Sequence, residues 1–131
     1  MAPRARREPR ENGAAVVDFV LVLVVLIPLV FGIFQVGLVL LVRNTLASAA
    51  SEGARHAATA DRGPGDGIAV AREQIEGAIS GKFAQDVSAR QVMVDGAPGV
   101  EVVVRAEVPA LGLFGPTVEL EVSGSAVEEA L

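Results

Sequence analysis

The hydrophobic residues are concentrated in one long run near the N-terminus. Residues 19–42 contain no charged side chain and only one strongly polar side chain, Gln35. As a helix, this run would be about 36 Å long at about 1.5 Å per residue. The hydrocarbon core of a bilayer is about 30 Å thick, so a tilted helix of this length crosses it. The pattern predicts one membrane-spanning helix.

The helical pattern continues beyond this run. Residues 43–58 are rich in alanine, the best helix former, and no helix breaker separates them from the apolar run. Small side chains recur at helical spacing and form one weakly apolar face: Leu46, Ala50, Ala54, Ala57 and Ala58. We therefore predict one continuous helix over residues 14–59, with a transmembrane part at 14–42 and a helical stem at 43–60.

A second, shorter helix is expected after a break in the chain. Residues 61–67 contain three glycines and a proline, which predicts a linker. Residues 68–80 have an amphipathic helical pattern that ends at Gly81. The apolar face of this helix consists of Ile68, Ala71, Ile75, Ala78 and Ile79.

The remaining sequence is typical of β-strands. Residues 90–95, 100–108 and 117–127 are rich in β-branched residues or alternate between apolar and polar positions, and residues 96–99 predict a turn. The fold class is therefore α+β. A long N-terminal transmembrane and stem helix precedes a short helix and a small antiparallel sheet of about three strands, and residues 68–131 form the small domain.

The distribution of charge predicts an orientation. Arg4, Arg6, Arg7 and Arg10 precede the apolar run, so the positive-inside rule places residues 1–13 in the cytoplasm as a basic leader. The part after the run is then extracytoplasmic. That part is acidic within a chain of net charge −5, which disfavours a nucleic-acid partner.

The sequence offers little for catalysis. It has no cysteine, which excludes disulfides and thiolate metal sites, and it has a single histidine. No arrangement typical of a nucleophilic triad, a metal cluster or a phosphate-binding loop is present. We expect no enzymatic activity, cofactor or metal, and we interpret His56 as a solvated side chain beside Arg55.

The most informative short stretch precedes the apolar run. Gly13 follows the basic leader, and Asp18 stands five residues later, at the mouth of the membrane segment. A carboxylate at mid-membrane costs about 2.5–3.5 kcal/mol, so such a residue usually has a partner. Cleavage after Gly13 would supply one, because Ala14 would then carry a free ammonium group near Asp18.

A secretory signal peptide is the rival interpretation. The small residues Ala47, Ser48 and Ala49 could form its cleavage site. However, the apolar run is much longer than the about 7–15 residues of a signal-peptide core, and a carboxylate at its start is unusual. We therefore favour a membrane anchor that stays attached to the chain over a secretory signal cleaved near Ala49.

Several features together resemble a known family. The basic leader, the Gly13-Ala14 junction and Asp18 followed by Phe19 resemble the class III signal of type IV pilins and pseudopilins. With Pro28, with Phe31-Gly32 and with the segment around Glu52-Gly53-Ala54-Arg55, the chain is similar to TadE-like pseudopilins of tight-adherence (Flp) pilus systems. The similarity covers residues 13–58, and the acid that is usually Glu in that family is Asp18 here.

The resemblance implies a structural role. It implies a pilin-like fold and a minor, membrane-anchored subunit involved in pilus assembly and processed by a prepilin peptidase. Its partners would be membrane lipid, the peptidase, other pilins or pseudopilins and the assembly machinery. It assigns processing to Gly13, Ala14 and Asp18. The residues that it implicates in assembly or packing are Phe19, Pro28, Gly32, Glu52, Gly53 and Arg55.

One alternative remains open from the residues alone. An uncleaved single-pass envelope protein could use its outer domain to bind another envelope component. In that case replacement of Gly13 or Asp18 would leave function unchanged.

Overall fold

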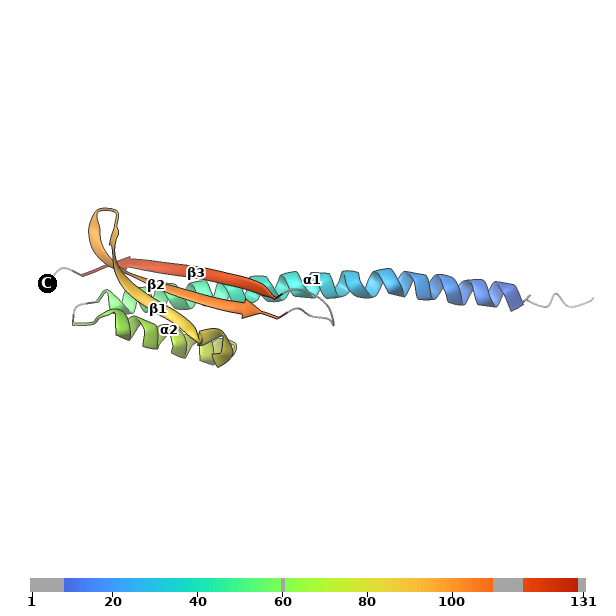
Figure 1. Ribbon diagram of the computed structural model, residues 1–131, viewed down its shortest axis with the longest axis horizontal. Coiled ribbons are helices and arrows are strands. Elements are labelled where there is room, and N and C mark those ends of the chain that lie inside the picture. Colours follow the sequence, from blue (N-terminus) through green and yellow to red (C-terminus); the bar gives the residue numbers. More distant parts are fainter. Residues whose placement is uncertain (1–8, 60, 110–116, 130–131) are drawn as a thin grey trace, which may run out of the picture.

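A long helix carries a small domain at one end of the molecule (Figure 1). The computed structural model describes residues 9–59, 61–109 and 117–129. The elements in chain order are α1 (Pro9–Ala57), α2 (Pro64–Ala78), the 3₁₀ helix η1 (Gly81–Ala84), β1 (Asp86–Val94), β2 (Ala97–Val108) and β3 (Val118–Val127). The predicted α+β fold is confirmed.

Helix α1 is a single helix of 49 residues that joins the apolar run to the stem. Its predicted continuity is therefore confirmed. Pro28 lies inside it without interrupting it. The helix begins at Pro9 rather than at the predicted residue 14, because a proline in the first turn loses no intrahelical hydrogen bond.

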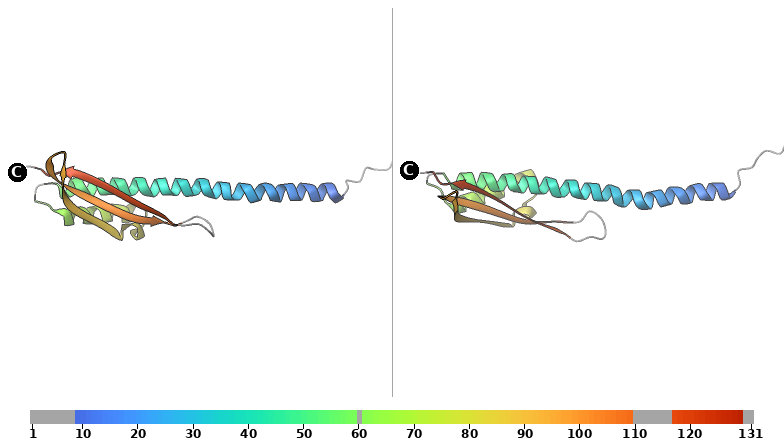
Figure 2. Two further views of the ribbon diagram at one scale, coloured as in Figure 1. Left: turned by 45° about the horizontal axis from the view of Figure 1, so that its top comes forward. Right: turned by 90° about the horizontal axis from the view of Figure 1, so that it is seen from above.

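The second half of α1 lies against the domain and supplies much of its core (Figures 1 and 2). The predicted small-residue face is confirmed, because all of its side chains are buried. The buried apolar residues of α1 are Val42, Leu46, Ala49, Ala50, Ala54 and Ala57, with Ala58 directly after the helix. Those from Val42 to Ala54 pack in one cluster with Ile75 of α2 and with several valines of the sheet.

Two glycines allow α1 and α2 to approach closely. A Cβ atom placed on Gly53 would lie 2.6 Å from the carbonyl oxygen of Gly67. A Cβ atom on Gly67 would lie 2.7 Å from the carbonyl oxygen of Gly53 and 2.8 Å from the Cβ of Ala57. The two backbones are therefore in direct contact, and any side chain at either glycine would push the helices apart.

The predicted linker at 61–67 is too long. Helix α2 already begins at Pro64, a favoured first helical residue. The Asp66 carboxylate accepts a hydrogen bond of 2.9 Å from the backbone N–H of Gly63, which stabilises this helix start. The apolar face of α2 is also narrower than predicted, since Ala71 and Ile75 are buried whereas Ala78 is exposed.

The three strands form one antiparallel sheet in the order β1-β2-β3. The predicted turn at residues 96–99 and the predicted start of the first strand at residue 90 are both wrong. The turn is at Asp95 and Gly96, whose φ angles are +49° and +82°, as a two-residue type I′ hairpin requires. Pro98 therefore lies in β2, where it pairs with Met93. Strand β1 starts at Asp86 rather than at residue 90, because its first residues pair with the end of β2.

The sheet has one apolar face and one polar face. Val100, Val102, Val104 and Val108 of β2 are fully buried toward the helices. The backbone of β3 approaches α1 closely, since a Cβ atom on Gly124 would lie 2.5 Å from the backbone nitrogen of Ser51. The whole sheet is thereby fixed against the stem of α1.

We predict that Gly53→Ala destabilises the domain. The added methyl group cannot fit between the helix backbones, and such overpacking costs about 1–3 kcal/mol. Gly77→Ala is the matched control, because the same change in α2 meets no atom within 4 Å and should leave the melting temperature unchanged or slightly raised. Thermal unfolding of both variants, followed by circular dichroism in detergent, measures the difference. Equal melting temperatures for the two variants would contradict the close helix contact.

Candidate functional site

The first half of α1 extends away from the domain. In the described part of the chain, α1 is the one helix that is long and apolar enough to cross a membrane. Its most apolar window of 18 residues has a mean hydropathy of 3.0, and none of it is buried. It is therefore not the core helix of a soluble domain, and an apolar surface of this length fits a membrane anchor.

The predicted processing residues lie at the far end of this exposed half. Gly13 and Ala14 are both inside α1 and are exposed. Asp18 is also exposed and follows Ala14 by four residues, so the two residues share one face of the helix. An amino group created at Ala14 would therefore be one helical turn from the Asp18 carboxylate.

The predicted packing residues of the apolar run also face outward. The side chain of Phe19 is 65% exposed, and a Cβ atom on Gly32 would meet nothing within 4 Å. Pro28 is exposed on the same helix. Because these residues are exposed among the described parts of the chain, they are available to lipid or to a neighbouring helix.

The predicted packing residues around Gly53 differ in where they lie. Gly53 is buried against α2, so it serves the fold of this chain. Glu52 and Arg55 point outward and form an ion pair with an N–O distance of 3.8 Å between side chains that are 51% and 73% exposed. Such a pair contributes at most about 1 kcal/mol to stability. Their charges therefore remain accessible to a partner.

His56, which could have reached Glu52, instead contacts Arg62. The guanidinium Nη1 of Arg62 donates to Nε2 of the imidazole ring. Since arginine has no acceptor, the histidine accepts this hydrogen bond. This contact joins the end of α1 to the turn before α2.

A comparison with family models tests the resemblance to TadE-like proteins. Residues 13–55 match the family model of TadE-like proteins. This segment is TadE-like. The match covers the exposed half of α1 and the stem as far as Arg55, and it confirms the resemblance drawn from the sequence motifs. No curated protein and no solved structure matches the chain.

The TadE-like segment suggests involvement in the Tad pilus system and an association with membrane and pilus components. It also bears on the signal-peptide alternative. A cut after Ala49 would run through the matched segment and would remove Val42, Leu46 and Ala49 from the core. The fold thus argues against a secretory cleavage site at this position.

One polar contact in the TadE-like segment was not recognised from the sequence. Gln35, the polar residue inside the apolar run, donates a side-chain hydrogen bond of 3.3 Å to the backbone oxygen of Pro109 at the end of β2. The partner lies 74 residues away in the chain, so sequence spacing alone could not reveal it. Leu38 and Val39 also pack against the core of the domain. The domain therefore contacts the C-terminal part of the apolar run, from Gln35 onward.

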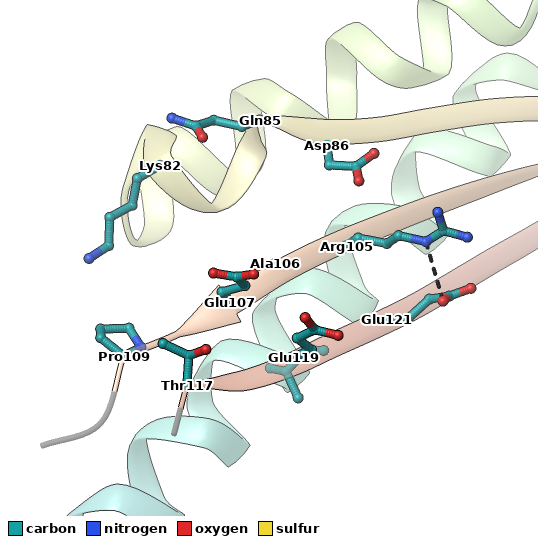
Figure 3. Close-up of a pocket in the computed structure, with 11 residues that line it drawn as sticks. Lys82, Gln85, Asp86, Arg105, Ala106, Glu107, Pro109, Thr117, Glu119 and Glu121 are labelled. Atoms are coloured by element: carbon teal, nitrogen blue, oxygen red, sulfur yellow. Dashed lines mark ion pairs between the residues drawn. The ribbon is translucent and has the colours of Figure 1, made fainter. Parts of the chain in front are cut away.

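The outer face of the sheet, beyond the TadE-like segment, carries a shallow polar groove of about 850 Å³ (Figure 3). Arg105 of β2 and Glu121 of β3 form an exposed ion pair across it at 3.3 Å. Glu107 and Glu119 lie directly opposite each other in neighbouring strands. Among the described residues no group of three or more His, Asp or Glu side chains could hold a metal ion.

Proposed function

We propose that this protein is a minor, pseudopilin-like structural subunit that takes part in the assembly of a Tad (Flp) type IV pilus. The observation that carries the proposal is the exposed apolar half of α1, which bears Ala14 and Asp18 on one helix face and lies within the TadE-like segment. A helix of this kind can insert in a membrane and can also pack against similar helices.

The proposed orientation follows from the charges at the two ends of α1. The arginine-rich leader remains in the cytoplasm, and the small domain lies on the other side of the membrane. In that orientation the Gly13-Ala14 junction is at the cytoplasmic mouth of the helix, where a prepilin peptidase can cut it.

Cleavage changes the electrostatics of the helix start. It removes the leader and creates an ammonium group on Ala14, one turn from the Asp18 carboxylate. The pair can form within one chain or between neighbouring chains, and a paired charge enters an apolar assembly at much lower cost than a single one. The new charge thus favours packing of the processed helix beside others.

Exposed charges on the stem offer a second contact surface for a neighbouring subunit. Glu52 and Arg55 stand on the stem, exposed and only weakly paired with each other. They can exchange partners with a neighbouring subunit at little cost to the fold. This gives the stem a polar contact surface next to the apolar surface of the anchor.

Cleavage between Gly13 and Ala14 is the first expected outcome. Intact-mass analysis of the membrane-derived protein should show a chain that begins at Ala14, provided that a prepilin peptidase is present. Gly13→Leu should leave the chain at full length, because a bulky side chain then occupies the cut site. Gly37→Leu is the matched control, since a Cβ atom at this exposed position of the same helix meets nothing within 4 Å. Detection of only full-length wild-type chain would refute processing.

Assembly should depend on the charge of Asp18. Asp18→Asn keeps the size of the side chain but cannot pair with an ammonium group, so we expect insertion and cleavage to persist while surface pili are lost. Asp18→Glu keeps the charge and should retain pili. Counting pili by electron microscopy, alongside the intact mass of each variant, separates assembly from processing. Normal piliation with Asp18→Asn would instead favour the uncleaved envelope protein whose outer domain binds another envelope component.

A further inference from the structure

The end of the sheet nearest the anchor lies beside the apolar run. The chain leaves β2 at Pro109, whose backbone oxygen is bonded to Gln35. One apolar cluster joins this end of the sheet to the run. It contains Val42 of α1 and Val108 of β2, and the partly buried side chains packed against it include Leu38, Val39, Val118 and Leu120. The last part of the run, residues 38–42, is thus covered on one side by the domain.

Charged side chains occur at this same level. Strand β3 runs beside α1 (Figures 1 and 2). The backbone of Gly124 in this strand lies against that of Ser51 in the helix. Glu119 precedes Gly124 by five residues, which is about 17 Å of strand and equals about 11 residues of helix. Glu119 therefore lies near the level of residue 40 of α1, and Glu107 is directly opposite it in β2.

These carboxylates limit the depth of the domain. Both are exposed on the outer face of the sheet. Figure 3 shows them side by side near Pro109 and Thr117. An acidic side chain in the centre of the hydrocarbon costs about 2.5–3.5 kcal/mol, and two adjacent carboxylates also repel each other. The level of residues 38–42 must therefore lie outside the hydrocarbon core.

We propose that the hydrocarbon core ends at Gln35 and that the membrane-proximal end of the sheet rests among the lipid headgroups. The membrane span is then residues 14–34, shorter than the 14–42 expected from hydropathy. A helix over 14–34 is about 31 Å long, which matches a core of about 30 Å without further residues.

The headgroup layer accommodates what lies just beyond Gln35. It adds about 5–8 Å on each side of the core. Leu40 is five residues, or about 8 Å, beyond Gln35. Its exposed side chain and the Glu107 and Glu119 carboxylates thus share the interfacial layer, where both apolar and charged groups are tolerated.

The shorter span has a consequence at the other end of the helix. Residues 14–18 are needed to fill the hydrocarbon thickness, so Asp18 lies about 6 Å inside the inner edge of the core rather than at its mouth. A side chain at that depth requires a partner more strongly than one at the surface. The proposal itself depends only on membrane insertion of α1 and not on cleavage or pilus assembly.

Cysteine accessibility tests the boundary, because the chain contains no native cysteine. The single variants are Leu29→Cys, Ile33→Cys and Leu40→Cys, at positions that are 56%, 65% and 53% exposed on α1. Ser48→Cys, exposed on the stem, is the control that identifies the accessible side. The full chain is expressed without other pilus components, and spheroplasts or inverted vesicles are treated with a membrane-impermeant maleimide.

On the side where Ser48→Cys reacts, Leu40→Cys should react before solubilisation. Leu29→Cys and Ile33→Cys should react only after detergent is added. Labelling of Leu40→Cys only after detergent would overturn the proposal and restore a span to residue 42. Labelling of Ile33→Cys before detergent would place the boundary below Gln35 and would overturn it as well. None of these outcomes depends on whether the peptidase acts.

Discussion

The contact between the stem of α1 and the rest of the domain is the interaction on which this structure depends. Three strands and a short helix enclose a core only because α1 lies along them and contributes Leu46 and a series of alanines. The small side chains are essential, since they let α2 approach at Gly53 and Gly67 and let β3 approach at Gly124. Larger residues on this face would separate the layers.

This contact also joins the domain to the membrane. The helix whose second half is buried in the domain continues without a break into the exposed apolar half. The position of the domain relative to the bilayer is then set by the helix rather than by a flexible linker. Gln35 adds a hydrogen bond at the point where the two environments meet. In a chain of this design, a change in the position of the membrane helix also moves the outer domain.

Much of the fold could be predicted from local patterns, because helix continuity and the small-residue face of α1 depend on spacing within one element. The errors arose where the local strand or turn preference of a segment differs from what its contacts with distant segments impose. The start of β1 includes weak strand formers such as Asp86 and Ala89 and is held by its pairing with β2. The Asp95-Gly96 turn could have been found from its own signature, whereas the adjacent Pro98 misled the prediction. Of the candidate site, the motif residues were proposed from the sequence, and their roles in processing and assembly stay predictions. The contact of Gln35 with Pro109 and the burial of Gly53 depend on segments that meet only in the folded chain.

The central claim is that the outer domain has no stable core without the stem of α1. The most direct measurement compares two soluble fragments, residues 42–131 and residues 61–131, by circular dichroism and thermal unfolding. We expect the longer fragment to show mixed helix and strand content and a cooperative transition, because it keeps the buried face of α1. The shorter fragment should be unfolded, since it loses Leu46, Ala50 and Ala54. A cooperative transition in the shorter fragment, at a similar temperature, would contradict the account.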